Sequence, residues 1–145
     1  MTDNKQFVAT VENWVADAEE RALMVARDAI DNLTNDAQTT TDRGGRMRYK
    51  TGFLSASGRA ALGSMPSGPN VRPVDAVNGQ FSWDGDAVTT VLASLEPGDV
   101  FYYGWTANYA EVRNTYDGFL DAPVQNWQKY VDDAVMRLRR AAGDR

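Results

Sequence analysis

The feature that most constrains this chain is an unbroken helical periodicity over its first 37 residues. No glycine or proline interrupts this stretch, and its apolar side chains recur at the three- and four-residue steps of one helix face. The pattern predicts a single long helix from Asp3 to Ala37, with Thr2 or Asp3 as its N-cap. The apolar positions are Phe7, Val8, Val11, Trp14, Val15, Ala18, Ala22, Val25, Ala26, Ala29, Ile30 and Leu33.

After Trp14 the apolar face of this helix carries mostly small side chains, among them Ala18, Ala22, Ala26 and Ala29. Small side chains allow another backbone to approach closely. Two interpretations stay open. The face packs on the domain's own sheet, or part of it also meets another subunit.

The middle of the chain reads as β-structure separated by turns. A strand is predicted from Thr51 to Leu62, and an aromatic one from Val100 to Thr106. Two further strands, Gln80–Trp83 and Ala87–Leu95, flank Asp84-Gly85, a strong hairpin signal. The same Asp84-Gly85-Asp86 sequence matches a calcium loop only at its start, because the glutamate expected at the twelfth position is replaced by Leu95.

Two stretches, 38–50 and 63–73, have the composition of flexible loops. The first contains Gly44-Gly45 and a run of basic residues, and the second contains three prolines and two glycines. Residues 37–62 carry five basic residues and one acidic residue. Such a run has two interpretations, a solvated loop or a contact with an acidic neighbour or a phosphate group.

A final helix is predicted from Ala122 to Ala142, with Asp121 and Pro123 suiting its first turn. Its apolar face includes Val124, Trp127 and Val131, and we expect Trp127 to anchor it on the sheet. The element order of helix, sheet and helix predicts an α+β fold. It would have a long N-terminal helix, a small, mainly antiparallel sheet and a C-terminal helix packed on the sheet. At 145 residues, with no long linker, the chain should form one domain spanning 1–145.

Composition limits the chemistry of the chain. It contains no histidine and no cysteine, which rules out Ser-His-Asp and Cys-His catalysis and zinc sites with His or Cys ligands. Carboxylate or lysine chemistry stays open, since the chain has 20 acidic residues, but we interpret these as a solvated surface. We expect no enzymatic activity, no catalytic residues, and no metal or cofactor site. The net charge of −5 argues against sequence-specific nucleic-acid binding. No apolar stretch is long enough to span a bilayer, and the first residues do not have the pattern of a signal peptide. The absence of cysteine suits folding in a reducing cytoplasm.

The aromatic run after residue 100 is the other unusual feature. It could form a stacking platform for sugars or bases, one face of the sheet, or a contact between subunits. Core or subunit contact is the interpretation we favour. Together with the basic run, it supplies the candidate subunit contacts: Arg43, Arg46, Arg48, Tyr102, Tyr103, Trp105 and Tyr109.

Three short motifs resemble those of the small head–tail joining, or tail-completion (neck), proteins of long-tailed bacteriophages. Thr51-Gly52-Phe53-Leu54-Ser55-Ala56-Ser57 is similar to that family's TG-x-L-x-x-S segment. Ala107-Asn108-Tyr109-Ala110-Glu111-Val112 is similar to its Y-A-x-x-V-E segment. The sequence from Gly118 to Trp127 is similar to its final F-x-x-x-A-V-x-x-W motif, with Pro123 in place of the alanine. The order of the elements agrees along most of the chain.

The resemblance implies a virion structural protein assembled in the host cytoplasm. It would form a ring homo-oligomer, a hexamer or a dodecamer, at the head–tail junction. Its partners would be the head connector or stopper and the tail terminator or tail-tube proteins, with DNA passing through the channel without sequence-specific binding. A tail terminator and a small-molecule-binding α+β domain remain the alternatives.

Overall fold

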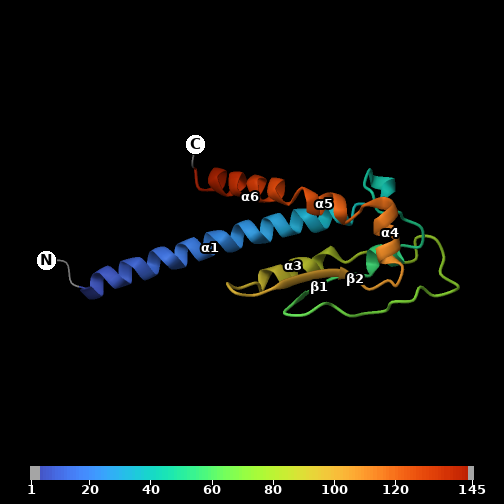
Figure 1. The fold of residues 1–145 in the computed structure, drawn as a ribbon, viewed down its shortest axis with the longest axis horizontal. Coiled ribbons are helices and arrows are strands. Elements are labelled where there is room, and N and C mark those ends of the chain that lie inside the picture. The colour runs from blue at the N-terminus through green and yellow to red at the C-terminus, as the bar shows by residue number, and fades with distance from the viewer. Residues whose placement is uncertain (1–3, 144–145) are drawn as a thin grey trace.

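The computed structural model describes the backbone of residues 4–143 and the side chains of residues 16–143. The predicted long helix is confirmed as α1, Asn4–Ala37. It extends beyond the rest of the fold at its N-terminal end (Figure 1). Several sequence expectations lie outside the described residues or side chains: the caps at Thr2 and Asp3, and the apolar positions Phe7, Val8, Val11, Trp14 and Val15.

The C-terminal helix is present but is divided in two. Helix α5 spans Asp121–Gln125, and α6 spans Trp127–Ala141, with the break at Asn126. Helix α6 runs antiparallel beside α1 (Figure 1). Arg137 binds Asp28 at 2.7 Å, and the Tyr130 hydroxyl donates to the Asp36 carboxylate at 2.5 Å. Two buried small residues, Ala29 and Ala134, let the helices approach closely.

The expected burial of Trp127 is wrong, because 41% of this residue is exposed. Tyr130 already bonds Asp36, which lies in the last turn of α1. Trp127 is the first residue of α6, and it lies on the exposed side of this helix. Of the alanine stripe of α1, only the C-terminal part is covered, because Ala29 is buried whereas Ala18 and Ala22 are exposed.

The sheet consists of two antiparallel strands, β1 (Gly58–Leu62) and β2 (Phe101–Trp105). Gly58 pairs with Trp105, and Leu62 pairs with Phe101. Strand β2 confirms the predicted aromatic strand. Only the second half of the predicted strand Thr51–Leu62 is found, because its first half forms a short helix, α2, Phe53–Ala56. The α+β fold class is confirmed.

The expected hairpin at Asp84-Gly85 is wrong. Gln80–Trp83 forms no strand, and the second predicted strand is a helix, α3, Gly85–Ala93. Asp84 caps this helix, since its side chain accepts hydrogen bonds from the backbone N–H groups of Asp86 and Ala87. Val88 and Leu92, one helical turn apart, are both buried. Helix α3 packs against β1 and α1.

The two predicted loops differ from each other. In 38–50 the chain forms a 3-10 turn, η1, Thr41–Arg43, and pairs Thr40 with Met47, whose side chain is fully buried. This stretch therefore contributes to the core, contrary to our expectation. Residues 63–73 form no helix or strand and are mostly exposed. The flexibility of both stretches stays a prediction.

A further helix, α4, spans Ala110–Asp117 and ends at Gly118, which has a left-handed backbone. It begins within the Y-A segment, at Ala110. The hydrophobic core lies at this end of the molecule, where α2, α4 and β2 meet. Its buried members are Met47, Phe53, Leu54, Ala107 and Phe119.

Candidate functional site

The Thr51-Gly52 turn forms one wall of a pocket beside this core. Gly52 has φ +84, and a Cβ atom there would lie 1.9 Å from the Phe81 carbonyl oxygen, so only glycine fits. The backbone N–H of Phe81 donates to the Thr51 carbonyl at 2.9 Å and holds the turn against the following segment. Phe53 and Leu54 are buried beneath the turn and supply a rigid apolar wall.

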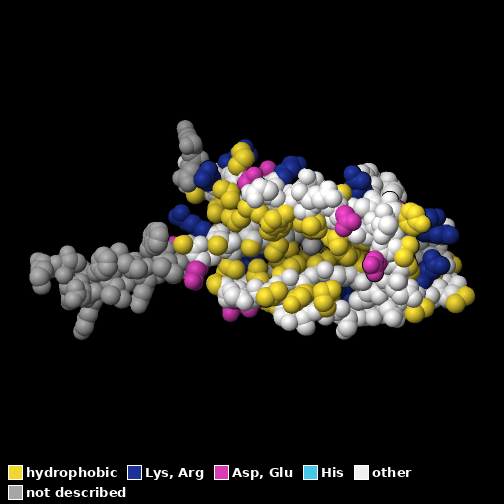
Figure 2. Space-filling view, in the orientation of Figure 1, with side chains coloured by type: hydrophobic (Ala, Val, Ile, Leu, Met, Phe, Trp, Pro, Cys, Tyr) yellow, Lys and Arg dark blue, Asp and Glu magenta, His cyan; other side chains and the backbone are white. Residues whose placement is uncertain are grey.

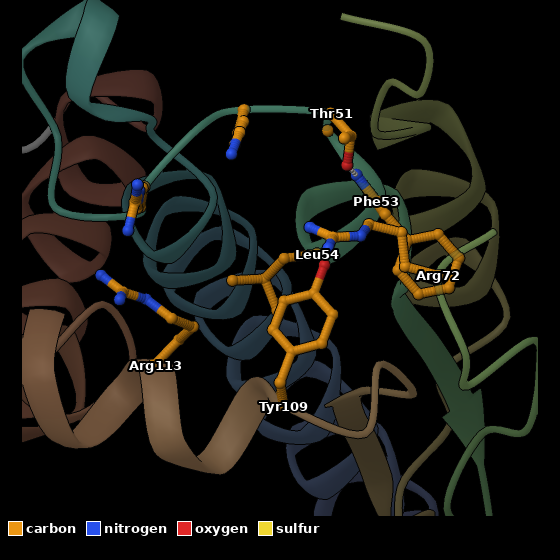
Figure 3. A pocket seen from close by; sticks show the side chains of 9 residues that line it. Thr51, Phe53, Leu54, Arg72, Tyr109 and Arg113 are labelled. Atoms are coloured by element: carbon orange, nitrogen blue, oxygen red, sulfur yellow. Dashed lines mark hydrogen bonds between the residues drawn. The ribbon is translucent and has the colours of Figure 1, made fainter. Parts of the chain in front are cut away.

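The pocket has a volume of about 190 Å3 and is lined by four basic residues: Arg48, Lys50, Arg72 and Arg113. They come from three parts of the chain: the loop before the Thr51-Gly52 turn, the Pro-rich loop, and α4. Figure 3 shows Arg72 and Arg113 beside this hollow, with the Tyr109 ring between them. Among the residues that the structure describes, none with an acidic side chain lines it. We refer to this hollow as the basic pocket.

Only one of these four cations has an acidic partner among the described side chains. Arg113 binds Asp117 at 2.5 Å, one helical turn along α4. Within the described part of the chain, Arg48, Lys50 and Arg72 form no ion pair. Placing like charges around one hollow is unfavourable unless an anion offsets them. The pocket is therefore an electropositive site in an otherwise acidic protein.

Tyr109 joins the pocket to the core. Its ring lies 6.4 Å from the Phe53 ring, and the Arg72 guanidinium lies 5.9 Å from the Tyr109 ring centroid. Burial raises the pKa of the Tyr109 hydroxyl, and the nearby positive charge of Arg72 partly offsets this increase. The hydroxyl is therefore protonated near neutral pH and can donate a hydrogen bond.

The structure separates the basic members of the predicted contact set. Arg48 lines the basic pocket with Tyr109. Arg46 lines a different hollow, which Ala122 and Tyr130 also line. Arg43 lies exposed at the end of η1. Whether any of these residues contacts another subunit stays a prediction.

The aromatic members of that set also fall into separate places. Tyr103 and Trp105 point to one face of the sheet, where Trp105 packs edge-on against Tyr103 and Phe119 at 5.0 and 4.9 Å. The Tyr103 hydroxyl accepts a 2.7 Å hydrogen bond from the Gln38 side chain. Both rings thus take part in packing within the subunit. Tyr102 lies between them in sequence and, on a strand, faces the opposite side.

Sequence reasoning did not identify Arg72 and Arg113 as site residues. Arg72 lies in a Pro-rich loop, and nothing in its local sequence indicates that the loop folds back toward the Thr51-Gly52 turn. Arg113 could have been found if 110–117 had been predicted as a helix. Residues 109 and 113 are then one turn apart, and the Arg113 N–H does bond the Tyr109 carbonyl at 3.0 Å.

A second surface feature is a groove of about 470 Å3 between α1 and α3. Met24, Leu92 and Ala93 supply its apolar lining, and Met24 is 47% exposed. Figure 2 shows a band of hydrophobic side chains along this face of the molecule, over α1 and toward α3. An extended apolar band on a surface indicates a binding surface. We call this hollow the α1–α3 groove.

Comparisons with protein-family models, curated proteins and solved structures found no match. Among the described residues, no helix is long and apolar enough to cross a membrane. The same residues include no cluster of three or more acidic, histidine or cysteine side chains that could hold a metal ion.

Proposed function

We propose that this chain is a structural subunit of the bacteriophage head–tail junction, where it forms a ring that completes the tail or joins it to the head. The sequence motifs support this role. The Thr51-Gly52 segment forms a wall of the basic pocket, and the Y-A segment supplies Tyr109 on the opposite side. Two of the three motifs therefore meet in one place.

The observation that carries the proposal is the pairing of a projecting helix with an open groove. Residues 16–22 of α1 are all exposed and extend beyond α6 and α3 (Figure 1). The sequence continues the apolar helical spacing toward the N-terminus through Trp14, Val11 and Phe7. The α1–α3 groove suits the binding of such a helix, because amphipathic helices bind in grooves through apolar side chains at this spacing.

A helix of one copy that binds the groove of the next copy makes a head-to-tail contact. Such contacts use two different surfaces and close into rings when the rotation between copies is suitable. A hexamer or dodecamer is the expected ring. Its neighbours would be the head connector or stopper on one side and the tail terminator or tail-tube proteins on the other. DNA would pass through the centre without sequence-specific contacts.

Electron microscopy of tails mixed with the purified chain tests this location. We expect density at the head-proximal end of the tail tube, and a gold-labelled chain should mark that end alone. Labelling along the whole tube, or no labelling at any ratio of chain to tube, would contradict the proposal. The same tubes incubated with an unrelated protein of similar charge provide the control.

A further inference from the structure

We infer that the basic pocket is a binding site for a phosphate group. The inference does not depend on ring formation. It rests on four cations from three separate parts of the chain that converge on a hollow, and no acid from the described part of the chain lines that hollow. Because these side chains repel one another, their convergence indicates an anionic ligand.

The charge balance favours phosphate over a single carboxylate. Asp117 already neutralises Arg113, which leaves Arg48, Lys50 and Arg72 without an acidic partner among the described side chains. A phosphate monoester carries a charge of about −1.5 to −2 at neutral pH and offers three acceptor oxygens. A carboxylate carries one charge and two oxygens. The phosphate therefore matches three cations arranged around a hollow more completely.

The geometry of the walls supports the same ligand. Arginine guanidinium groups form paired hydrogen bonds with phosphate oxygens, and a lysine ammonium adds a point charge. Tyr109 also lines the pocket, and its hydroxyl is a further hydrogen-bond donor. The Arg72 guanidinium lies over the Tyr109 ring. Phe53 and Leu54 exclude water from one side, and an apolar wall strengthens electrostatic attraction. A hollow of about 190 Å3 has room for a phosphate group and part of what it is attached to.

Two sources share the phosphoryl oxygens that the pocket would bind, a small phosphate monoester and a nucleic-acid backbone. The backbone phosphate is a diester with one negative charge and two free oxygens, so the charge balance favours the monoester. The test is calorimetric titration of the whole protein with inorganic phosphate at constant ionic strength, with acetate as the carboxylate comparison. A second titration uses a short DNA duplex in the presence and absence of phosphate. Arg72→Gln and Lys50→Gln remove one pocket charge each. Arg139→Gln removes an exposed charge on α6 and is the matched control.

We expect saturable phosphate binding that weakens roughly tenfold or more in each pocket variant and is unchanged in Arg139→Gln. Acetate should bind much more weakly. Competition between the duplex and phosphate would identify a nucleic-acid backbone as the source, whereas phosphate binding without duplex binding would identify a small ester. The inference is overturned if no saturable binding occurs, if acetate binds equally well, or if Arg139→Gln weakens binding as much as the pocket variants. Lys50 is exposed, so its variant keeps the test decisive should Arg72→Gln fail to fold.

Discussion

Gln38, at the end of α1, donates a 2.7 Å hydrogen bond to the hydroxyl of Tyr103 on β2. The same amide group bonds the Ser55 carbonyl of α2, and the Ser55 hydroxyl donates back to Gln38. One buried side chain thus ties three elements together. Gly58 makes this possible, because a Cβ atom there would lie 1.9 Å from the Gln38 amide nitrogen.

The first prediction concerns the pH dependence of stability. Burial raises the pKa of Tyr103 to about 12, although its hydrogen bond with Gln38 acts in the opposite direction. The unfolded chain releases this proton near pH 10, and the folded protein keeps it. The contribution of Tyr103 should therefore be complete below pH 10 and be lost as the pH rises toward 12. The free energy of unfolding, measured with denaturant, should decrease less over that pH range for Tyr103→Phe than for the wild type. Equal slopes for both proteins would contradict the prediction.

The second prediction compares two aromatic residues near the ends of the C-terminal motif. Phe119 is 2% exposed and packs against Trp105, whereas Trp127 is 41% exposed. Phe119→Ala should reduce the free energy of unfolding by about 3–5 kcal/mol, the range for buried aromatic residues. Trp127→Ala should cost less than about 1.5 kcal/mol, as expected for a largely exposed side chain. Denaturant unfolding of both variants measures these losses, and a larger loss for Trp127→Ala than for Phe119→Ala would contradict the prediction.

Asp84 provides the third prediction. Its carboxylate accepts hydrogen bonds from the N–H groups of Asp86 and Ala87 at 3.1 and 3.2 Å, and these groups would otherwise lack partners at the start of α3. Asp84→Ala should cost about 1 kcal/mol in unfolding free energy, and Asp84→Asn should restore most of it. If both variants have the same free energy of unfolding as the wild type, the Asp84 cap does not stabilise the fold.

The fourth prediction concerns the two loops. The N–H of Thr41 bonds the Met47 carbonyl at 2.9 Å, and the N–H of Met47 bonds the Thr39 carbonyl at 3.3 Å. Within the described structure, no backbone N–H of residues 64–75 donates a hydrogen bond. In the free subunit, hydrogen exchange at Thr41 and Met47 should be roughly tenfold or more slower than in 64–75. If the Pro-rich loop becomes ordered on assembly, its exchange should slow in the ring, and an unchanged rate would rule out that ordering.

The parts of the fold that were predictable are those fixed by local pattern. The periodicity of α1 continues for many turns without a breaker, and the aromatic residues of β2 have high strand preference. The hairpin predicted at Asp84-Gly85 was wrong because the same pair of residues suits both a hairpin turn and the start of a helix. The apolar spacing of Val88 and Leu92 decides for the helix, once α1 and β1 are there to bury it.

The candidate site was only half predictable, for a physical reason. Arg48 and Tyr109 were identified from the sequence, but the pocket forms only because Arg72 and Arg113 lie beside them. This arrangement depends on the path of the Pro-rich loop and on the turn that Gly52 permits. Neither can be predicted from a periodic pattern of apolar residues. Trp127 was misjudged because apolar spacing along a helix does not reveal whether another element covers that face, and both Val124 and Trp127 are exposed.

Ring formation is the central claim, and the native mass of the purified chain tests it most directly. We predict a mass of six or twelve times the 16.0 kDa of one chain. Met24→Glu places a charge in the α1–α3 groove and should shift the protein to single folded chains. Val112→Glu alters a residue of similar exposure on α4, away from the groove, and should keep the ring. A wild-type protein that remains a single chain at all concentrations, or a Met24→Glu variant that keeps the full ring mass, would contradict the account.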